Sequence, residues 1–139
     1  MDDDKDDDLK ILVAEDDGPH QKIFVRLMNS LGYRDITMTD DGLEFFLKAF
    51  AEDFDVGFVD LMMPYMDGLS AVKKLRTYGR NGLILIAMTG PVDPEMRSKV
   101  YDAGMNGYIE KPLDEEALKR IMDKVVLKKR AQRSKSAFV

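Results

Sequence analysis

The sequence lacks cysteine and tryptophan altogether and has a single histidine among its 139 residues. Without cysteine the chain forms neither a disulfide framework nor a thiolate metal site, which fits a reducing compartment. No apolar run approaches the roughly 20 residues that a membrane helix needs. The acidic N-terminus also differs from the basic and then apolar start of a secretory signal. We therefore expect a soluble, cytoplasmic protein that does not bind membranes.

The chain has fewer basic than acidic residues: it contains 21 Lys and Arg residues and 26 Asp and Glu residues, which give a net charge of -5. A nucleic-acid backbone is bound through clustered cations, so direct binding to nucleic acid is not expected. The length suits one domain. We expect residues 1–8 to be a disordered acidic tail, residues 9–130 to form the domain, and residues 131–139 to be a flexible basic tail.

Basic residues gather near the C-terminus, where we expect the last helix to fray: Lys128, Lys129, Arg130, Arg133 and Lys135. A solvated helix end whose cations suit the negative end of the helix dipole explains them. A polybasic tail that docks on a partner or on a membrane surface is the alternative.

Short apolar runs alternate with amphipathic stretches along the domain. The runs typical of strands covered on both faces are Lys10–Ala14, Val56–Asp60 and Leu83–Met88, with weaker candidates at Asp35–Thr39 and Gly107–Glu110. Helices are expected over Pro19–Leu31, Gly42–Phe50, Gly68–Tyr78, Pro94–Asp102 and Asp114 to about Arg130, with Asp93 and Asp114 as N-caps. The alternation predicts an α/β fold, a doubly wound five-stranded parallel sheet in flavodoxin-like order 2-1-3-4-5 with five helices.

Chemically useful side chains follow four of the five expected strands. They are Glu15, Asp16 and Asp17 after the first, Asp60 at the end of the third, Thr89 at the end of the fourth and Lys111 after the fifth. The carboxyl ends of parallel strands share one edge, where ligands bind. Carboxylates crowded there would repel one another, and a hard divalent cation such as Mg²⁺ resolves the repulsion. Asp60 would then be a nucleophile toward a phosphoryl group, with Lys111 and the Thr89 hydroxyl on its oxygens. Any one of these residues alone would be a cap, a turn or a surface residue, so the prediction depends on their convergence.

At these residues the chain resembles the response-regulator receiver family of two-component and phosphorelay signalling. The resemblance extends from Leu9 to about Val126 and is carried by ILVAEDD (11–17), VDLMMPYMDGL (59–69), IAMTG (86–90) and YIEKP (108–112). It implies that Asp60 is the phosphoacceptor, that Glu15 and Asp16 are the acidic pair, and that Asp16, Asp60 and the backbone carbonyl of Met62 hold the metal. It also implies that Lys111 contacts the phosphoryl group, and a cis bond between Lys111 and Pro112 is expected.

The resemblance implies a conformational switch as well. Thr89 would move toward the phosphoryl group and Tyr108 would turn inward behind it, so that the face of the fourth and fifth strand–helix units binds an unknown downstream partner. The donor would be a histidine kinase or a histidine phosphotransfer protein. The chain would be a monomer or a phosphorylation-linked dimer. It would be a signalling phosphoacceptor rather than an enzyme, catalysing only its own phosphorylation and slow dephosphorylation.

Other interpretations of the sequence remain open. Met62 and Pro91 cannot orient a water molecule through a polar side chain, which leads to the hypothesis of slow self-dephosphorylation. His20 is interpreted as an exposed residue of a first helical turn, with no orienting partner visible in the sequence. The main alternative function is a pseudo-receiver, an interaction module without phosphoryl turnover. A phosphatase would need an acid or base where Leu61 and Met62 stand, and no nucleotide-binding glycine motif follows the first strand. A stand-alone regulator, a phosphorelay shuttle and a piece of a hybrid kinase are all compatible with the sequence.

Overall fold

The computed structural model describes residues 9–63 and 66–137, with side chains as far as residue 134. Its five strands are β1 (Ile11–Ala14), β2 (Ile36–Thr39), β3 (Val56–Asp60), β4 (Ile84–Thr89) and β5 (Gly107–Glu110). They form one parallel sheet in the order β2-β1-β3-β4-β5. The predicted fold class is therefore confirmed. The acidic tail expected over residues 1–8 lies outside the described residues.

Aspartates mark the starts of the helices. The helices are α2 (Gly18–Ser30), α3 (Gly42–Ala51), α4 (Gly68–Thr77), α5 (Pro94–Asp102) and α6 (Glu115–Ala137). The residues whose side chains accept a hydrogen bond from the backbone N–H three positions later are Asp17, Asp41, Asp67, Asp93 and Asp114. Such a bond satisfies a donor that the first helical turn leaves free. The predicted caps Asp93 and Asp114 are confirmed.

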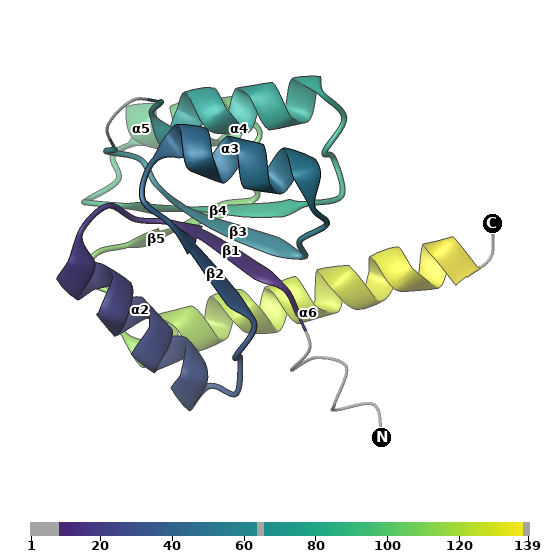
Figure 1. The fold of residues 1–139 in the computed structure, drawn as a ribbon, viewed down its shortest axis with the longest axis horizontal. Coiled ribbons are helices and arrows are strands. Elements are labelled where there is room, and N and C mark those ends of the chain that lie inside the picture. Colours follow the sequence, from purple (N-terminus) through teal and green to yellow (C-terminus); the bar gives the residue numbers. More distant parts are fainter. Residues whose placement is uncertain (1–8, 64–65, 138–139) are drawn as a thin grey trace.

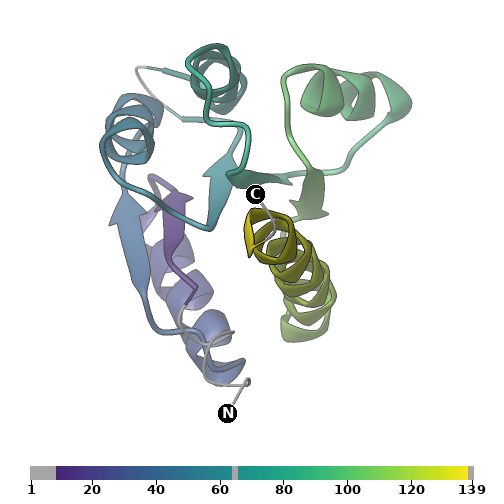
Figure 2. The same cartoon turned by 90° about the vertical axis from the view of Figure 1, so that its right-hand side faces the viewer.

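The helices cover both faces of the sheet, with α2 and α6 on one side and α3, α4 and α5 on the other (Figure 1). Figure 2, turned by 90°, shows the same two layers around the twisted sheet. Successive side chains of a strand point to opposite faces. Ile11 and Val13 of β1 accordingly pack with α2 and α6, while Leu12 and Ala14 pack on the other side. Burial on both faces explains why the strands are almost continuously apolar.

The C-terminal helix departs from the sequence-based expectation. Its predicted end near Arg130 is wrong, because α6 continues to Ala137, so the expected flexible tail is helical as far as that residue. Lys129, predicted to be solvated, is only 8% exposed. Its ammonium group donates hydrogen bonds to the Gly82 carbonyl oxygen and to Gln132 Oε1, both at 3.0 Å. The amide of Gln132 also donates to the Gly82 carbonyl oxygen, at 3.2 Å, so the helix is held against the start of β4.

Among the helices of the described residues, none is both long enough and apolar enough to cross a bilayer.

Candidate functional site

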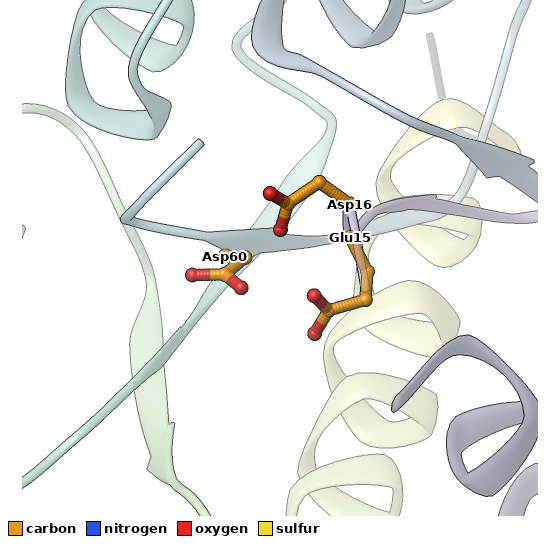
Figure 3. A group of neighbouring side chains, drawn as sticks. All are labelled: Glu15, Asp16 and Asp60. Carbon is orange, nitrogen blue, oxygen red and sulfur yellow. The ribbon is translucent and has the colours of Figure 1, made fainter. Parts of the chain in front are cut away.

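The pairing of β1 with β3 brings carboxylates together at one edge of the sheet. Ala14 pairs with Val59, so the residues that follow in the two strands, Glu15 and Asp60, are neighbours where both strands end. Asp16 comes next in the chain, and oxygens of all three carboxylates lie within 4.8 Å of one another. Figure 3 shows their oxygen ends gathered around a common space. This is also where the strand order reverses, the usual place for a ligand in an open α/β sheet.

The carboxylates differ in their access to solvent. Glu15 and Asp60 are buried, whereas Asp16 is exposed. Burial raises the pKa of Glu15, and the negative charge of Asp60 acts in the same direction. Hydrogen bonds from Lys111 and from the backbone N–H of Asp17 oppose this rise. The site therefore holds carboxylates that repel one another and need a counter-charge.

Lys111 supplies part of that counter-charge. Its ammonium nitrogen lies 2.6 Å from Glu15 Oε1 and 2.8 Å from Asp60 Oδ2. Burial by itself would lower the pKa of Lys111, but the hydrogen bonds with Asp60 and Glu15 raise it overall, so the ammonium group stays charged. Three carboxylates and one ammonium group leave two negative charges in excess. A divalent cation with oxygen ligands, such as Mg²⁺, fits this donor set.

The other residues singled out in the sequence lie around this cluster. The backbone N–H of Met62 donates to Asp60 Oδ1 at 2.9 Å, while the Met62 side chain is 84% exposed. Thr89 is half-buried at the end of β4, and its carbonyl oxygen accepts from the backbone N–H of Lys111 at 2.7 Å. Tyr108, on β5, is half-exposed, with its ring centroid 6.4 Å from that of Tyr101 on α5. The expected cis bond between Lys111 and Pro112 is confirmed.

His20 is the site neighbour that the sequence analysis missed. Its imidazole is 52% exposed, which agrees with the expected exposed position, and the structure gives it neighbours that the sequence analysis did not identify. Its Nδ1 lies 3.5 Å from Asp17 Oδ2, 3.8 Å from Glu15 Oε1 and 3.4 Å from Lys111 Nζ. The signal was present in the spacing of Asp17 and His20: a capping residue fixes the third helical position beside itself.

Comparisons with known proteins agree with this geometry. Residues 11–123 match the family described as response regulator receiver domain. The chain is 33% identical over 127 residues to the osmosensing histidine protein kinase SLN1 of Saccharomyces cerevisiae, a match that covers 87% of this chain and 10% of the kinase. It is 31% identical over 118 residues to the chemotaxis protein CheY-3 of Vibrio cholerae, covering 84% of this chain and 91% of that protein.

A solved structure extends the comparison. The receiver domain of a sensor histidine kinase from Pseudomonas aeruginosa PAO1, described with a magnesium ion coordinated in the active site cleft, has a TM-score of 0.76 and 32% identity. The match covers 85% of this chain and 97% of that domain.

Proposed function

Because the chain belongs to the response regulator receiver family, we propose that it is a signalling phosphoacceptor in which Asp60 takes a phosphoryl group from a phosphohistidine donor. The observation that carries the proposal is the contact of Lys111 with both Asp60 and Glu15 inside a cluster of three carboxylates. A buried acid held by a lysine and flanked by two further acids is poorly explained as a helix cap or a surface residue.

The proposed reaction assigns each side chain a role at a stated atom. A carboxylate oxygen of Asp60 attacks the phosphorus atom, the bond between phosphorus and the donor imidazole nitrogen breaks, and the imidazole leaves with the electron pair. The Lys111 ammonium group, now 2.8 Å from Asp60 Oδ2, is placed to pair with the oxygens of the incoming phosphoryl group. The Thr89 hydroxyl donates to another of these oxygens, and Tyr108 turns inward behind Thr89.

Mg²⁺ is the proposed cofactor. Asp16, Asp60 and the carbonyl oxygen of Met62 would hold it, with Glu15 beside them. When bound, the ion neutralises negative charge that develops during phosphoryl transfer. The excess of negative charge in the cluster supports this assignment, as does the magnesium ion described for the Pseudomonas aeruginosa relative.

The donor in this proposal is a histidine kinase or a histidine phosphotransfer protein in the cytoplasm. Histidine kinases among the relatives support it. The match spans only 10% of the yeast kinase, so none of that protein's other activities is carried over. The downstream partner would bind the face formed by α5, β5 and α6. The phosphorylated form would lose its phosphoryl group slowly, because Met62 and Pro91 offer no polar side chain to orient water.

Intact-mass spectrometry after brief incubation with acetyl phosphate and Mg²⁺ tests the proposal. We expect the protein to gain one phosphoryl group and the variant Asp60→Asn to gain none. The matched control is Asp93→Asn, because asparagine caps a helix about as well as aspartate and Asp93 starts α5, outside the cluster. This control should be modified like the wild type. Unmodified wild-type protein would instead favour the pseudo-receiver.

A further inference from the structure

Helix α3 carries more apolar surface than its place in the fold needs. Only Glu44 and Lys48 are charged among its ten residues, GLEFFLKAFA. A helix that is apolar all round is normally buried on all sides. In this protein Phe45 and Ala49 are buried against the sheet, while the opposite side of α3 remains in solvent.

The exposed side forms a continuous stripe. Leu43, Leu47 and Phe50 follow the spacing that places side chains along one side of a helix, and they are 45%, 55% and 44% exposed. Tyr78, at the end of α4, is 61% exposed and its ring centroid lies 5.8 Å from that of Phe50. We call Leu43, Leu47, Phe50 and Tyr78 the outer stripe. Within the described residues, no element lies over this side of α3, and α4 lies alongside it (Figure 1).

Charged residues border the outer stripe at both ends. Asp40, Asp41 and Glu44 lie at the N-terminal end of α3. Lys48 lies in its last turn, and the guanidinium group of Arg80 lies 5.3 Å from the centroid of the Phe50 ring. Two acids lie at this end as well: Glu52, which is paired with Lys48 at 3.2 Å, and the exposed Asp53 that follows it. The surface therefore runs from an end that carries only acids to an end where two cations stand beside two acids.

A surface of this kind is complementary to itself. A two-fold rotation about an axis through Leu47 sets the acidic end of one α3 against the end of the other that carries Lys48 and Arg80, and it opposes the two helix dipoles. Glu44 and Lys48 lie on the same flank of the helix, so Glu44 of each copy would face Lys48 of the other. A shallow, open hollow beside the stripe is lined by the apolar residues Leu43, Leu47 and Ala51 and by the charged residues Asp41, Glu44, Lys48 and Glu52.

From this symmetry we propose that the outer stripe is the interface of a two-fold homodimer in which α3 of one copy packs antiparallel against α3 of a second copy of this chain. Leu47 lies at the centre and meets its own counterpart, while Leu43 meets Phe50 at both ends. An exposed apolar patch bordered by complementary charges is typical of a protein–protein contact. This dimer uses a different face from α5, β5 and α6, and it does not depend on phosphorylation of Asp60.

Sedimentation velocity over a concentration series tests the proposal on the unphosphorylated full chain. We expect a monomer–dimer equilibrium that Leu47→Glu weakens at least about tenfold, because it buries a charge at the centre of the interface. Leu127→Glu is the matched control, since Leu127 is an exposed leucine of α6, and it should leave the equilibrium unchanged. Circular dichroism and thermal unfolding verify that both variants are folded. A wild-type protein that stays monomeric, or a dimer that tolerates Leu47→Glu, overturns the proposal.

A charge exchange tests the antiparallel arrangement without touching the apolar residues. Glu44→Lys and Lys48→Glu should each weaken self-association, because every cross-pair then joins like charges. An equimolar mixture of the two variants should dimerise again, since in the mixed dimer each lysine of the first variant faces a glutamate of the second. Failure of the mixture to recover dimer would contradict the pairing of Glu44 with Lys48.

Discussion

At the scale of single residues, Lys129 is a cation held in an almost closed environment. Its ammonium group has the Gly82 carbonyl oxygen as a close acceptor, and the nearest carboxylate, that of Asp55, is 4.0 Å away. Burial lowers the pKa of Lys129 from its ordinary value of 10.5. The charged form is thus disfavoured in the folded state. Between the lowered folded value and 10.5 the unfolded chain binds more protons than the folded chain, so this residue's contribution to stability rises with pH in that window and is unfavourable below it.

Replacing this charge should cost little at neutral pH. We expect Lys129→Met to keep the free energy of unfolding at pH 7 within about 1 kcal/mol of wild type or to raise it, because an apolar side chain avoids the burial of charge. The Gly82 carbonyl oxygen keeps the amide of Gln132 as a donor. Urea unfolding at pH 7 and near pH 10 measures the difference between the two proteins. The free energy of unfolding of the wild type should rise relative to that of the variant as the pH rises. A fall relative to the variant would contradict a lowered pKa for Lys129.

Met62 gives a second prediction at the residue scale. Its side chain is 84% exposed beside the proposed acceptor. We expect Met62→Gln to speed loss of the phosphoryl group by about tenfold, because the new amide can orient water next to Asp60. The decay of the phosphorylated mass after removal of acetyl phosphate measures this rate. Leu127→Gln, far from the site, serves as control. A wild-type lifetime of seconds would contradict slow dephosphorylation.

The site residues differ in how far the sequence could locate them. Glu15, Asp60 and Lys111 could be brought together in advance because each follows a strand, and parallel strands end at one edge. The burial of Lys129 and the approach of His20 to Lys111 could not be predicted, because these contacts come from tertiary packing. The fold places the first turn of α2, and with it His20, next to Lys111. Lys129 is buried because α6 lies against Gly82.

At the scale of the elements, Arg76 connects the end of α4 with two later segments. Its Nε donates to the Gly104 carbonyl oxygen at 2.9 Å, and its terminal nitrogens donate to the Leu83 carbonyl oxygen at 2.7 Å and to Asn106 Oδ1 at 2.9 Å. Asn106 Oδ1 also accepts from the backbone N–H of Leu85 at 2.8 Å. One side chain thereby joins α4, the start of β4 and the turn before β5. In the sequence it is one more cation on an amphipathic helix.

We expect Arg76→Met to lower the free energy of unfolding by about 2–4 kcal/mol, because it leaves several backbone carbonyls without a donor. Lys73→Met is the control, since Lys73 is exposed on the same helix and should change stability by no more than about 0.5 kcal/mol. Urea unfolding of both variants gives the comparison. If the two variants had equal free energies of unfolding, water would be able to replace the hydrogen bonds of the guanidinium group at no cost in stability.

Strand and helix boundaries were predictable where a cap or an apolar run defines them. Pro94–Asp102 and Val56–Asp60 have the expected bounds because Asp93 caps the helix and apolar residues fill the strand. The end of α6 was not predictable, since the basic residues there are equally compatible with a frayed end and a continuous helix. The hydrogen bonds of Lys129 and Gln132 to the Gly82 carbonyl oxygen stabilise the helical conformation of this segment.

At the scale of the whole molecule, the acidic cluster of Glu15, Asp16 and Asp60 should lower the stability of the fold when no cation is bound. Carboxylates that attract a cation repel one another in its absence. We expect Mg²⁺ to raise the free energy of unfolding, by about 2.7 kcal/mol at a free concentration near 100 times its dissociation constant. Asp16→Asn should raise the melting temperature without Mg²⁺, because one like charge is removed, and should reduce the response to Mg²⁺. Calorimetry with and without the ion measures both effects, and an unchanged response would exclude Asp16 as a ligand.

Helix α6 also gives the molecule a long axis. Its 23 residues measure about 35 Å, and its C-terminal part projects beyond the sheet (Figure 1). Leu118, Met122 and Val125 are buried in the core beside the sheet, and Lys129 and Gln132 hold the next turns at Gly82, so the helix is fixed along most of its length. Since 3.6 residues make one turn, inserting two residues after Arg133 would rotate anything attached to its end by more than half a circle. A rigid probe at Arg133 would accordingly report the tumbling of the entire body rather than local motion.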